Sequence, residues 1–179
     1  MKKMIMVLSI VILTGCNMLN INNTPTKKVE EFLNKYQILD EKVLNELDDV
    51  IEKKSRLNND NKEEYKEIIK KQYKDMQYKI KDTKIDGNEA FVTTEIIVKD
   101  YTKIINESEI YKRQNIREFY ENETYNDSLY KKYLIDKLKN AKDRVTYTIE
   151  FTLHKDNKEW VLDKISEDME DKILGIYNY

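Results

Sequence analysis

The single cysteine of this 179-residue chain, Cys16, stands where its neighbours define a chemistry for it. It is preceded by Thr14 and Gly15, and these small residues follow ten residues, Met4–Leu13, that are apolar except for Ser9. A cysteine thiol, once deprotonated, is a nucleophile that forms covalent bonds with carbon. The stretch therefore places a reactive sulfur directly after an apolar run and two small residues.

Residues 1–16 resemble a bacterial lipoprotein signal peptide that ends in a lipobox, Leu13-Thr14-Gly15-Cys16. Lys2 and Lys3 supply the basic start of such a signal, and the apolar run is shorter than the about 20 residues that span a bilayer. The resemblance implies that cleavage occurs between Gly15 and Cys16 and that the sulfur of Cys16 carries a lipid. There are two alternatives. Residues 1–16 could be an ordinary export signal in which the cysteine occurs by chance, or they could form a buried N-terminal helix.

The same resemblance implies how the chain is divided and where it resides. It makes residues 1–15 the signal peptide and residues 16–23 a lipidated tether. The length of the remainder, residues 24–179, suits a single domain. Two acyl chains, such as palmitate, anchor a protein stably because each buried methylene contributes about 0.8 kcal/mol. Asn17 rather than Asp follows the cysteine, so the sequence shows no signal for retention in an inner membrane. We expect the lipid on Cys16 to hold the protein at the extracytoplasmic face of the cell membrane.

The composition excludes several other classes of site. The chain has 32 basic and 34 acidic residues, and its net charge of −2 becomes −4 without Lys2 and Lys3, the wrong sign for binding a phosphate backbone. One cysteine and one histidine are too few for a Cys/His zinc site. The three glycines, Gly15, Gly87 and Gly175, lie too far apart for a phosphate-binding loop. We therefore expect no nucleic-acid partner, no metal and no cofactor.

Residues that could catalyse a reaction are also sparse. His154, the only side chain that ordinarily titrates near neutral pH, falls on the polar side of an alternating strand and is predicted to be a surface residue. Three acidic pairs lack the glycine and alternating oxygens of a calcium loop, and we expect them on solvated helix faces: Asp48-Asp49, Glu63-Glu64 and Glu167-Asp168. The sequence thus predicts no catalytic residue, and the protein is expected not to be an enzyme.

Eight of the 13 tyrosines fall into two groups. The first lies at helical spacing on apolar faces and is predicted to pack in the core, with a ligand cage as the alternative: Tyr65, Tyr73, Tyr130 and Tyr133. The second lies where burial is least certain and offers surface candidates: Tyr120, Tyr125, Tyr177 and Tyr179.

The spacing of apolar residues predicts the elements that position these side chains. Helices are predicted at residues 24–36, from Asp40 through Ile51, from Asp60 through Tyr73, from Asn106 to about Glu121, from Asp127 through Leu138, and at residues 166–174. The residues predicted to cap helices are Thr24 before Pro25, Asp60 with Glu63, Asn106 with Glu109, Asp127 and Ser166. Gly175 is predicted to end the last helix. Strands are predicted at Gln77–Ile85, Ala90–Tyr101, Val145–Leu153 and Trp160–Ile165, joined in pairs by turns at Asp86-Gly87-Asn88 and Asp156-Asn157. This order predicts an α+β fold in which N-terminal helices pack on a curved antiparallel sheet, with a helical insertion between two hairpins.

Two stripes are predicted to meet in the core. Phe151 and its apolar neighbours at every second position of residues 145–153 share one strand face. Phe32, Leu33 and Tyr36 form a matching stripe on the first helix.

The order of these elements resembles the cystatin-like or nuclear-transport-factor-two-like cone fold. The residues that carry the resemblance are the first helix at 24–36, the hairpin at Asp86-Gly87-Asn88, and the final pair from Asp156 to Leu162. It covers about residues 24–166, and the helices between Asn106 and Asn140 are an insertion relative to the simplest members. Enzymes of that fold, such as steroid isomerases and dehydratases, use Tyr, Asp or His inside the cone, but no motif here matches theirs.

These observations predict an extracytoplasmic binding or interaction module whose ligand the sequence does not identify. A small-cavity enzyme resembling the isomerases or dehydratases of the cone fold is one alternative. A transporter-associated solute receptor is another, although two-lobed receptors are usually larger and the sequence shows no second domain. The state of the concave sheet face separates the first two, since an open polar pocket there favours an enzyme.

Overall fold

The computed structural model describes residues 23–54 and 59–178. The expected signal peptide, the cleavage site at Gly15 and Cys16, and nearly all of the tether lie outside the described residues. Within the described part, no helix combines the length and the apolar character that crossing a membrane requires.

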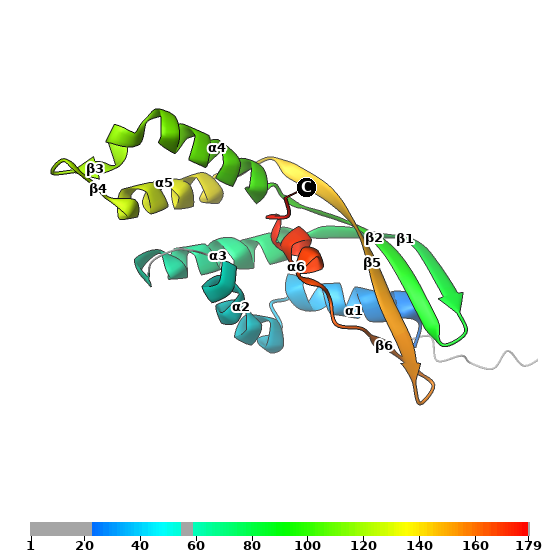
Figure 1. The fold of residues 1–179 in the computed structure, drawn as a ribbon. Coiled ribbons are helices and arrows are strands. Elements are labelled where there is room, and N and C mark those ends of the chain that lie inside the picture. The colour runs from blue at the N-terminus through cyan, green and yellow to red at the C-terminus, as the bar shows by residue number, and fades with distance from the viewer. Residues whose placement is uncertain (1–22, 55–58, 179) are drawn as a thin grey trace, which may run out of the picture.

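The described residues form an α+β fold, as predicted (Figure 1). The helices are α1 (Pro25–Gln37), α2 (Glu41–Lys54), α3 (Asn59–Asp75), α4 (Tyr101–Gln114), the 3-10 turn η1 (Ile116–Phe119), α5 (Asp127–Lys139) and α6 (Glu167–Leu174). The strands are β1 (Gln77–Asp86), β2 (Glu89–Lys99), β3 (Tyr120–Glu121), β4 (Thr124–Tyr125), β5 (Arg144–Asp156) and β6 (Glu159–Leu162).

One antiparallel sheet has the strand order β1-β2-β5-β6, and its two hairpins flank the α4–α5 segment along the chain. The central pair places Phe151 opposite Val92 and Tyr147 opposite Ile96. All four of these side chains are at most 1% exposed, so the alternation predicted for residues 145–153 is confirmed. Gly87 closes the first hairpin with a φ of +60°, a conformation that glycine adopts without steric cost.

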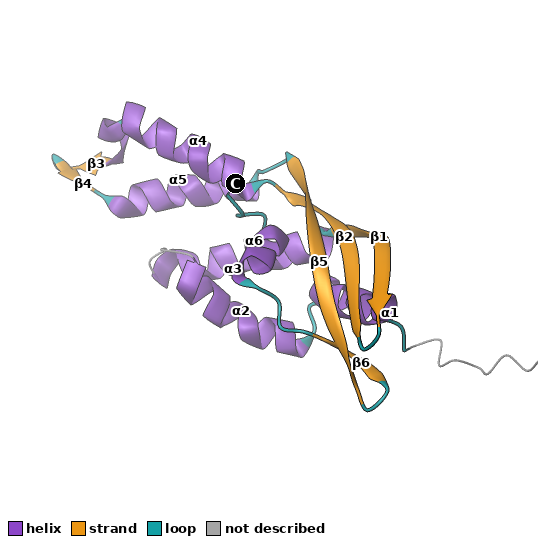
Figure 2. Ribbon diagram, turned by 45° about the vertical axis from the view of Figure 1, so that its right-hand side comes forward, coloured by secondary structure: helices purple, strands orange, loops and turns teal. Residues whose placement is uncertain are grey.

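The helices α1, α3 and α6 cover one face of this sheet (Figure 2). Thr24 caps α1 by accepting a hydrogen bond from the N–H of Lys27, as its position before Pro25 predicted. The rings of Phe32 and Phe151 meet edge to face with centroids 5.7 Å apart. The first helix therefore fills the inner face of the sheet, and the predicted meeting of the two apolar stripes is confirmed.

The predicted insertion is a helical arm formed by α4 and α5 with the short β3–β4 hairpin at its tip (Figure 1). The boundaries predicted for α4 were wrong, because the helix begins at Tyr101 and not at Asn106. Asp100 directly follows β2 and caps α4 by accepting a hydrogen bond from the N–H of Lys103 at 2.9 Å. Tyr101, predicted as the last residue of the strand, is instead the first residue of α4, and its side chain is buried in the core.

Two further boundaries differ from the prediction. Asn126, not Asp127, caps α5 by accepting a hydrogen bond from the N–H of Ser128. The final strand ends at Leu162, and the chain then leaves the sheet toward α6. Ser166 caps α6 and Gly175 ends it in a left-handed conformation, as predicted.

Candidate functional site

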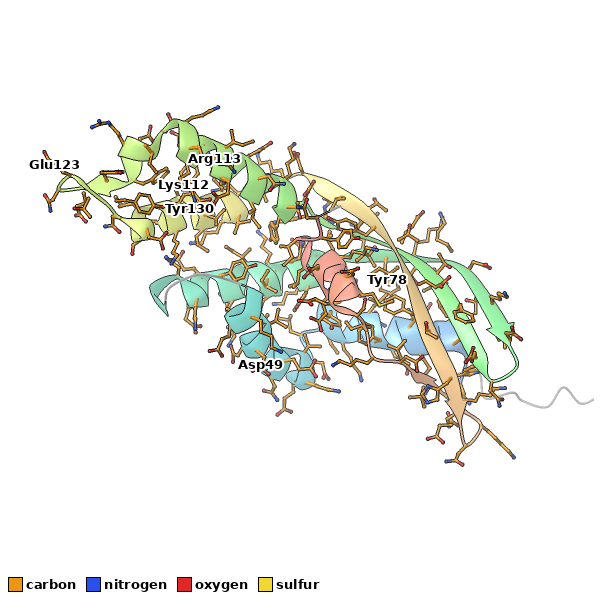
Figure 3. The ribbon with its side chains drawn as sticks, in the orientation of Figure 1. Asp49, Tyr78, Lys112, Arg113, Glu123 and Tyr130 are labelled. Atoms are coloured by element: carbon orange, nitrogen blue, oxygen red, sulfur yellow. The ribbon has the colours of Figure 1, made fainter. Side chains whose placement is uncertain are left out.

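An open groove of about 860 Å³ lies between α1, α2, the segment from Trp160 to Ile165, and α6. In Figure 3 the labelled Asp49 marks the α2 side of this groove. The groove lies beside the filled inner face of the sheet. We call it the α1–α2 groove.

Aromatic and aliphatic side chains form the inner wall of the α1–α2 groove. Phe32 and Tyr36, one helical turn apart on α1, meet edge to face at 5.2 Å between ring centroids. Tyr36 in turn meets Tyr73 of α3 edge to face at 4.9 Å. Val43, Leu47 and Val50 of α2 complete the wall on the opposite side. Because these side chains are aliphatic or aromatic and line the groove, they can contact the apolar part of a ligand.

Two phenol hydroxyls lie at the base of the groove. Neither Tyr36 nor Tyr73 forms a side-chain hydrogen bond with the rest of the described chain, although Tyr73 is only 3% exposed. Burial raises the pKa of both phenols well above the ordinary value, and the carboxylates of Glu46 and Glu170 raise each pKa further. Both phenols are therefore neutral at physiological pH and can donate or accept a hydrogen bond.

The rim of the groove is charged and nearly balanced. It carries five lysines, Lys28, Lys35, Lys42, Lys53 and Lys164, and five acids, Glu31, Glu46, Asp49, Asp163 and Glu170. Glu46 lies 3.8 Å from the ammonium of Lys42 in an exposed pair of the kind that contributes little stability. Glu170 is half-buried and forms no ion pair with any described residue.

His154 lies outside this groove, at the exposed end of β5. Its Nδ1 lies 2.6 Å from a carboxylate oxygen of Asp163, and the two side chains are 51% and 40% exposed. This pair could not be predicted from the sequence, because the two residues meet only through the pairing of β5 with the chain after β6. No hydroxyl or thiol among the described residues is hydrogen-bonded to His154, so the pair lacks the nucleophile of a catalytic triad.

The three acidic pairs do not converge. Asp48 forms an ion pair with Lys66 of α3 at 2.5 Å, and Glu64 pairs with Lys139 of α5. In residues 23–54 and 59–178, no three side chains of His, Cys, Asp or Glu are grouped so that they could hold a metal ion.

The predicted grouping of tyrosines holds, with one addition, for Tyr65, Tyr73, Tyr130, Tyr120 and Tyr125, but not for Tyr177, which packs against the core. Tyr65, Tyr73 and Tyr130 are at most 6% exposed and Tyr133 is half-buried, whereas Tyr120 and Tyr125 are exposed at the tip of the arm. Tyr177 is half-buried against Tyr147, and Tyr179 lies outside the described residues. Tyr130, labelled in Figure 3, donates a hydrogen bond from its hydroxyl to Glu109 at 2.6 Å. The addition is that Tyr73 belongs both to the core and to the groove.

No family model matches this chain, and no curated protein matches it. A solved structure that resembles it is that of YcdA, a candidate lipoprotein from Bacillus subtilis. The two share 15% sequence identity with a TM-score of 0.42, and the likeness covers 84% of this chain and 47% of the other. The chain thus spans about half the length of that protein. The α+β architecture accordingly rests on this chain's own helices and strands.

Sequence reasoning missed the α1–α2 groove as a whole. Its key side chains come from α1, α3 and α6, and Tyr36, Tyr73 and Glu170 are far apart in the sequence. One signal was present, since Tyr36 and Tyr73 carry polar hydroxyls on otherwise apolar helix faces.

Proposed function

We propose that this protein is a lipid-anchored lipoprotein at the extracytoplasmic face of the cell membrane, and that its domain binds a ligand in the α1–α2 groove. The anchor is supported by the resemblance of residues 1–16 to a lipoprotein signal. In this proposal residues 1–15 are removed, Cys16 carries the lipid, residues 16–23 form the tether, and residues 24–179 form the domain.

The attachment of the tether to the domain supports this arrangement. Residues 17–23 extend over about 25 Å at most, which keeps the domain near the membrane. Asn23 bonds the turn between β5 and β6: its side chain donates to the carbonyl of Lys158 and accepts from the N–H of Trp160, both at 3.0 Å. The arm tip lies at the opposite end of the molecule from the start of α1 (Figure 1). The tip therefore points away from the anchored end.

The proposed binding role is supported by one observation, the α1–α2 groove that lies beside the filled inner face of the sheet. The inner face of the sheet is packed against α1, and side chains such as Phe32 and Phe151 fill the space between them. The groove offers an apolar wall, two hydroxyls without a hydrogen-bond partner in the described part of the chain, and a charged rim. These are features of a site that binds a small ligand.

One observation favours the enzyme as the second candidate. Tyr36 and Tyr73 are neutral hydrogen-bond donors beside the carboxylates of Glu46 and Glu170. Two such donors can stabilise a developing oxyanion while a carboxylate moves a proton, which is the division of labour in an isomerase. Turnover that Tyr73→Phe reduces, measured on a ligand once it is known, separates this role from binding alone.

Lipid labelling tests the anchor. In cells grown with a palmitate analogue, the wild-type protein is expected to carry label and to fractionate with membranes. Cys16→Ala is expected to remove the label and to leave the chain uncleaved or released, whereas the control Asn22→Ala keeps both. If Cys16→Ala labels and fractionates like the wild type, the anchor proposal is wrong.

Copurification tests the groove. Val50 lines the groove and is half-buried, so Val50→Glu places a charge on its apolar wall. Ile110 of α4 is 52% exposed and far from the groove lining, and Ile110→Glu is the matched control. Mass spectrometry of small molecules extracted from the purified proteins is expected to find a species that the wild type and control retain and Val50→Glu loses. Equal recovery from all three contradicts binding in the groove.

A further inference from the structure

Three cations lie together where the central strands of the sheet pass into the helical arm (Figure 2). Lys99 is the last residue of β2, Arg144 is the first residue of β5, and the two are register partners. Lys71 lies on α3 directly before Gln72, whose side chain binds the backbone of Lys99. None of the three cations lines the α1–α2 groove, so they form a separate surface feature.

The register places Lys99 and Arg144 side by side on one face of the sheet. The N–H and the carbonyl of Lys99 bind Gln72 at 3.0 Å each, so they point away from β5. In an antiparallel pair without mutual backbone hydrogen bonds, the Cα atoms are about 4.5 Å apart and the side chains are closest. Phe151 faces α1, and Arg144, an odd number of residues away along β5, faces the other side of the sheet. Like charges placed opposite each other in this way destabilise a sheet.

No carboxylate of the described chain forms an ion pair with these cations. Lys70, the neighbour of Lys71 on α3, pairs with Glu67 at 2.6 Å, whereas Lys71, Lys99 and Arg144 have no such partner in residues 23–54 and 59–178. The three charges therefore stay uncompensated within the part of the chain that the structure describes.

The acids closest in the chain are bonded to other groups. Asp143, next to Arg144, forms an ion pair with Lys103. Asp100, next to Lys99, caps α4 by accepting a hydrogen bond from the N–H of Lys103. An anion at the cluster is therefore opposed chiefly by the carboxylate of Asp75, which is the acid that acts on Lys99.

Burial holds the ammonium of Lys99 in place. The residue is 9% exposed, so its aliphatic stem packs within the protein. Among the described residues, the only buried side-chain polar atom without a partner is the hydroxyl oxygen of Thr94, so the ammonium of Lys99 reaches solvent. Burial lowers the pKa of Lys99, the charges of Lys71 and Arg144 lower it further, and Asp75 opposes them. The ammonium is thus a positioned donor in need of an acceptor.

The guanidinium of Arg144 is positioned as well. Its Nη1 donates a hydrogen bond to the backbone carbonyl of Asp75, at the end of α3, at 3.2 Å. A guanidinium carries five N–H donors in a rigid fork, and this fork matches the oxygens of a phosphate group.

We propose that Lys71, Lys99 and Arg144 bind a phosphate group of a soluble ligand. The ammonium of Lys99 and the guanidinium of Arg144 donate hydrogen bonds to the phosphate oxygens, and Lys71 adds a third positive charge. Three cations beside one acid favour an anion with more than one negative charge over a single carboxylate. A lone cluster of this kind does not form the extended basic surface that a nucleic acid requires.

The position of the cluster favours a soluble ligand over a lipid headgroup. Arg144 and Asp156 are the first and last of the 13 residues of β5, and a strand of this length extends about 40 Å. Asn23, at the end of the proposed tether, bonds the carbonyl of Lys158 in the turn after Asp156. The cluster therefore lies at the end of β5 that is farther from the tether.

Titration of the full-length lipidated protein in dodecyl maltoside with inorganic phosphate tests the proposal. Phosphorus NMR at neutral pH and low salt is expected to show saturable broadening of the phosphate signal. Lys99→Met keeps an apolar stem, Arg144→Gln changes an exposed side chain, and each is expected to raise the Kd about tenfold or more. The controls Lys84→Met and Arg117→Gln remove exposed cations outside the cluster and are expected to bind like the wild type.

A thermal melt without phosphate shows that the variants are folded. Lys99→Met is expected to unfold at the same or a higher temperature than the wild type, because one of two opposed like charges is gone. Phosphate is expected to raise the melting temperature of the wild type but not that of Lys99→Met. Destabilisation of Lys99→Met without phosphate contradicts the opposed charges, and Arg144→Gln then decides whether the cluster binds phosphate.

Four results overturn the proposal. Equal Kd values for the wild type, Lys99→Met and Arg144→Gln place phosphate elsewhere, and the absence of saturable binding removes the site. Acetate that binds as tightly as phosphate assigns the cluster to carboxylates. Loss of phosphate binding on transfer from phosphatidylcholine to phosphatidylglycerol nanodiscs assigns it to a lipid headgroup. Because the cluster is separate from the α1–α2 groove, each result leaves the proposed binding role of the groove in place.

Discussion

Gln72 and Lys99 form a reciprocal pair in the interior of the protein. The side-chain amide of Gln72 donates to the carbonyl of Lys99 and accepts from its backbone N–H, both at 3.0 Å. The same amide donates to the carbonyl of Leu174 at 3.1 Å, and Gln72 is fully buried. One side chain thus joins α3, the end of β2 and the end of α6, and it fixes the helix layer on the sheet.

Replacing Gln72 tests the importance of this junction. Gln72→Met keeps the volume but leaves the N–H of Lys99 and two carbonyls without partners, so we expect a loss of about 3 kcal/mol in the free energy of unfolding. Gln114→Met, at the exposed end of α4, is the control and is expected to change it by less than about 0.5 kcal/mol. Urea unfolding of residues 17–179 measures both. A loss below about 1 kcal/mol for Gln72→Met shows that the junction is dispensable.

Gly175 makes this junction possible, and its replacement gives a second prediction. A Cβ at this position would lie 2.2 Å from the carbonyl oxygen of Lys99 and 2.5 Å from the Gln72 side-chain nitrogen, and the φ is +76°. Gly87 has a similar φ of +60° but nothing within 4 Å of its Cβ position. We expect Gly175→Ala to cost about 2–4 kcal/mol and Gly87→Ala about 1 kcal/mol in urea unfolding. Equal losses mean that the close approach at Gly175 relaxes freely.

The contact between Phe32 and Phe151 gives a third prediction. Phe151 is fully buried between α1 and the sheet, so Phe151→Ala is expected to cost about 3–5 kcal/mol in the free energy of unfolding. Thr152, one position along β5, faces the other side of the sheet and is only partly buried. Thr152→Ala should cost far less. Similar small losses at both positions contradict the assigned register of β5.

His154 is expected to be dispensable for stability. Its pair with Asp163 is about half exposed on both sides, and exposed pairs of this kind contribute little. We expect His154→Gln to change the free energy of unfolding by less than about 0.5 kcal/mol. Loss of groove ligand binding in His154→Gln at unchanged stability contradicts the surface role, because Asp163 is also part of the groove rim.

Sequence patterns predicted the local features of the fold well. The strict alternation of residues 145–153 gave β5, and the Thr24-Pro25 and Ser166 caps located α1 and α6. These features depend on residues close together in the chain. The predicted start of α4 was wrong because Asn106 and Glu109 have the spacing of a capping pair although they lie inside the helix. The helix is capped by Asp100, and its first residue, Tyr101, is buried against α3.

The features that depend on distant residues could not be read from the sequence. Gln72 resembles any polar residue on a charged helix, and only the fold brings it to Lys99 and Leu174. Tyr73 was predicted to be a core residue, and its place in the groove depends on α1 and α6. The division into signal, tether and domain, and the lipid on Cys16, stay predictions.

Mass spectrometry of the N-terminal peptide of the mature protein, isolated from membranes, tests the anchor most directly. Our account predicts a chain that begins at Cys16 with diacylglycerol bound through a thioether to its sulfur. A mature chain that begins upstream of Cys16, or that carries a free thiol at Cys16, would contradict it.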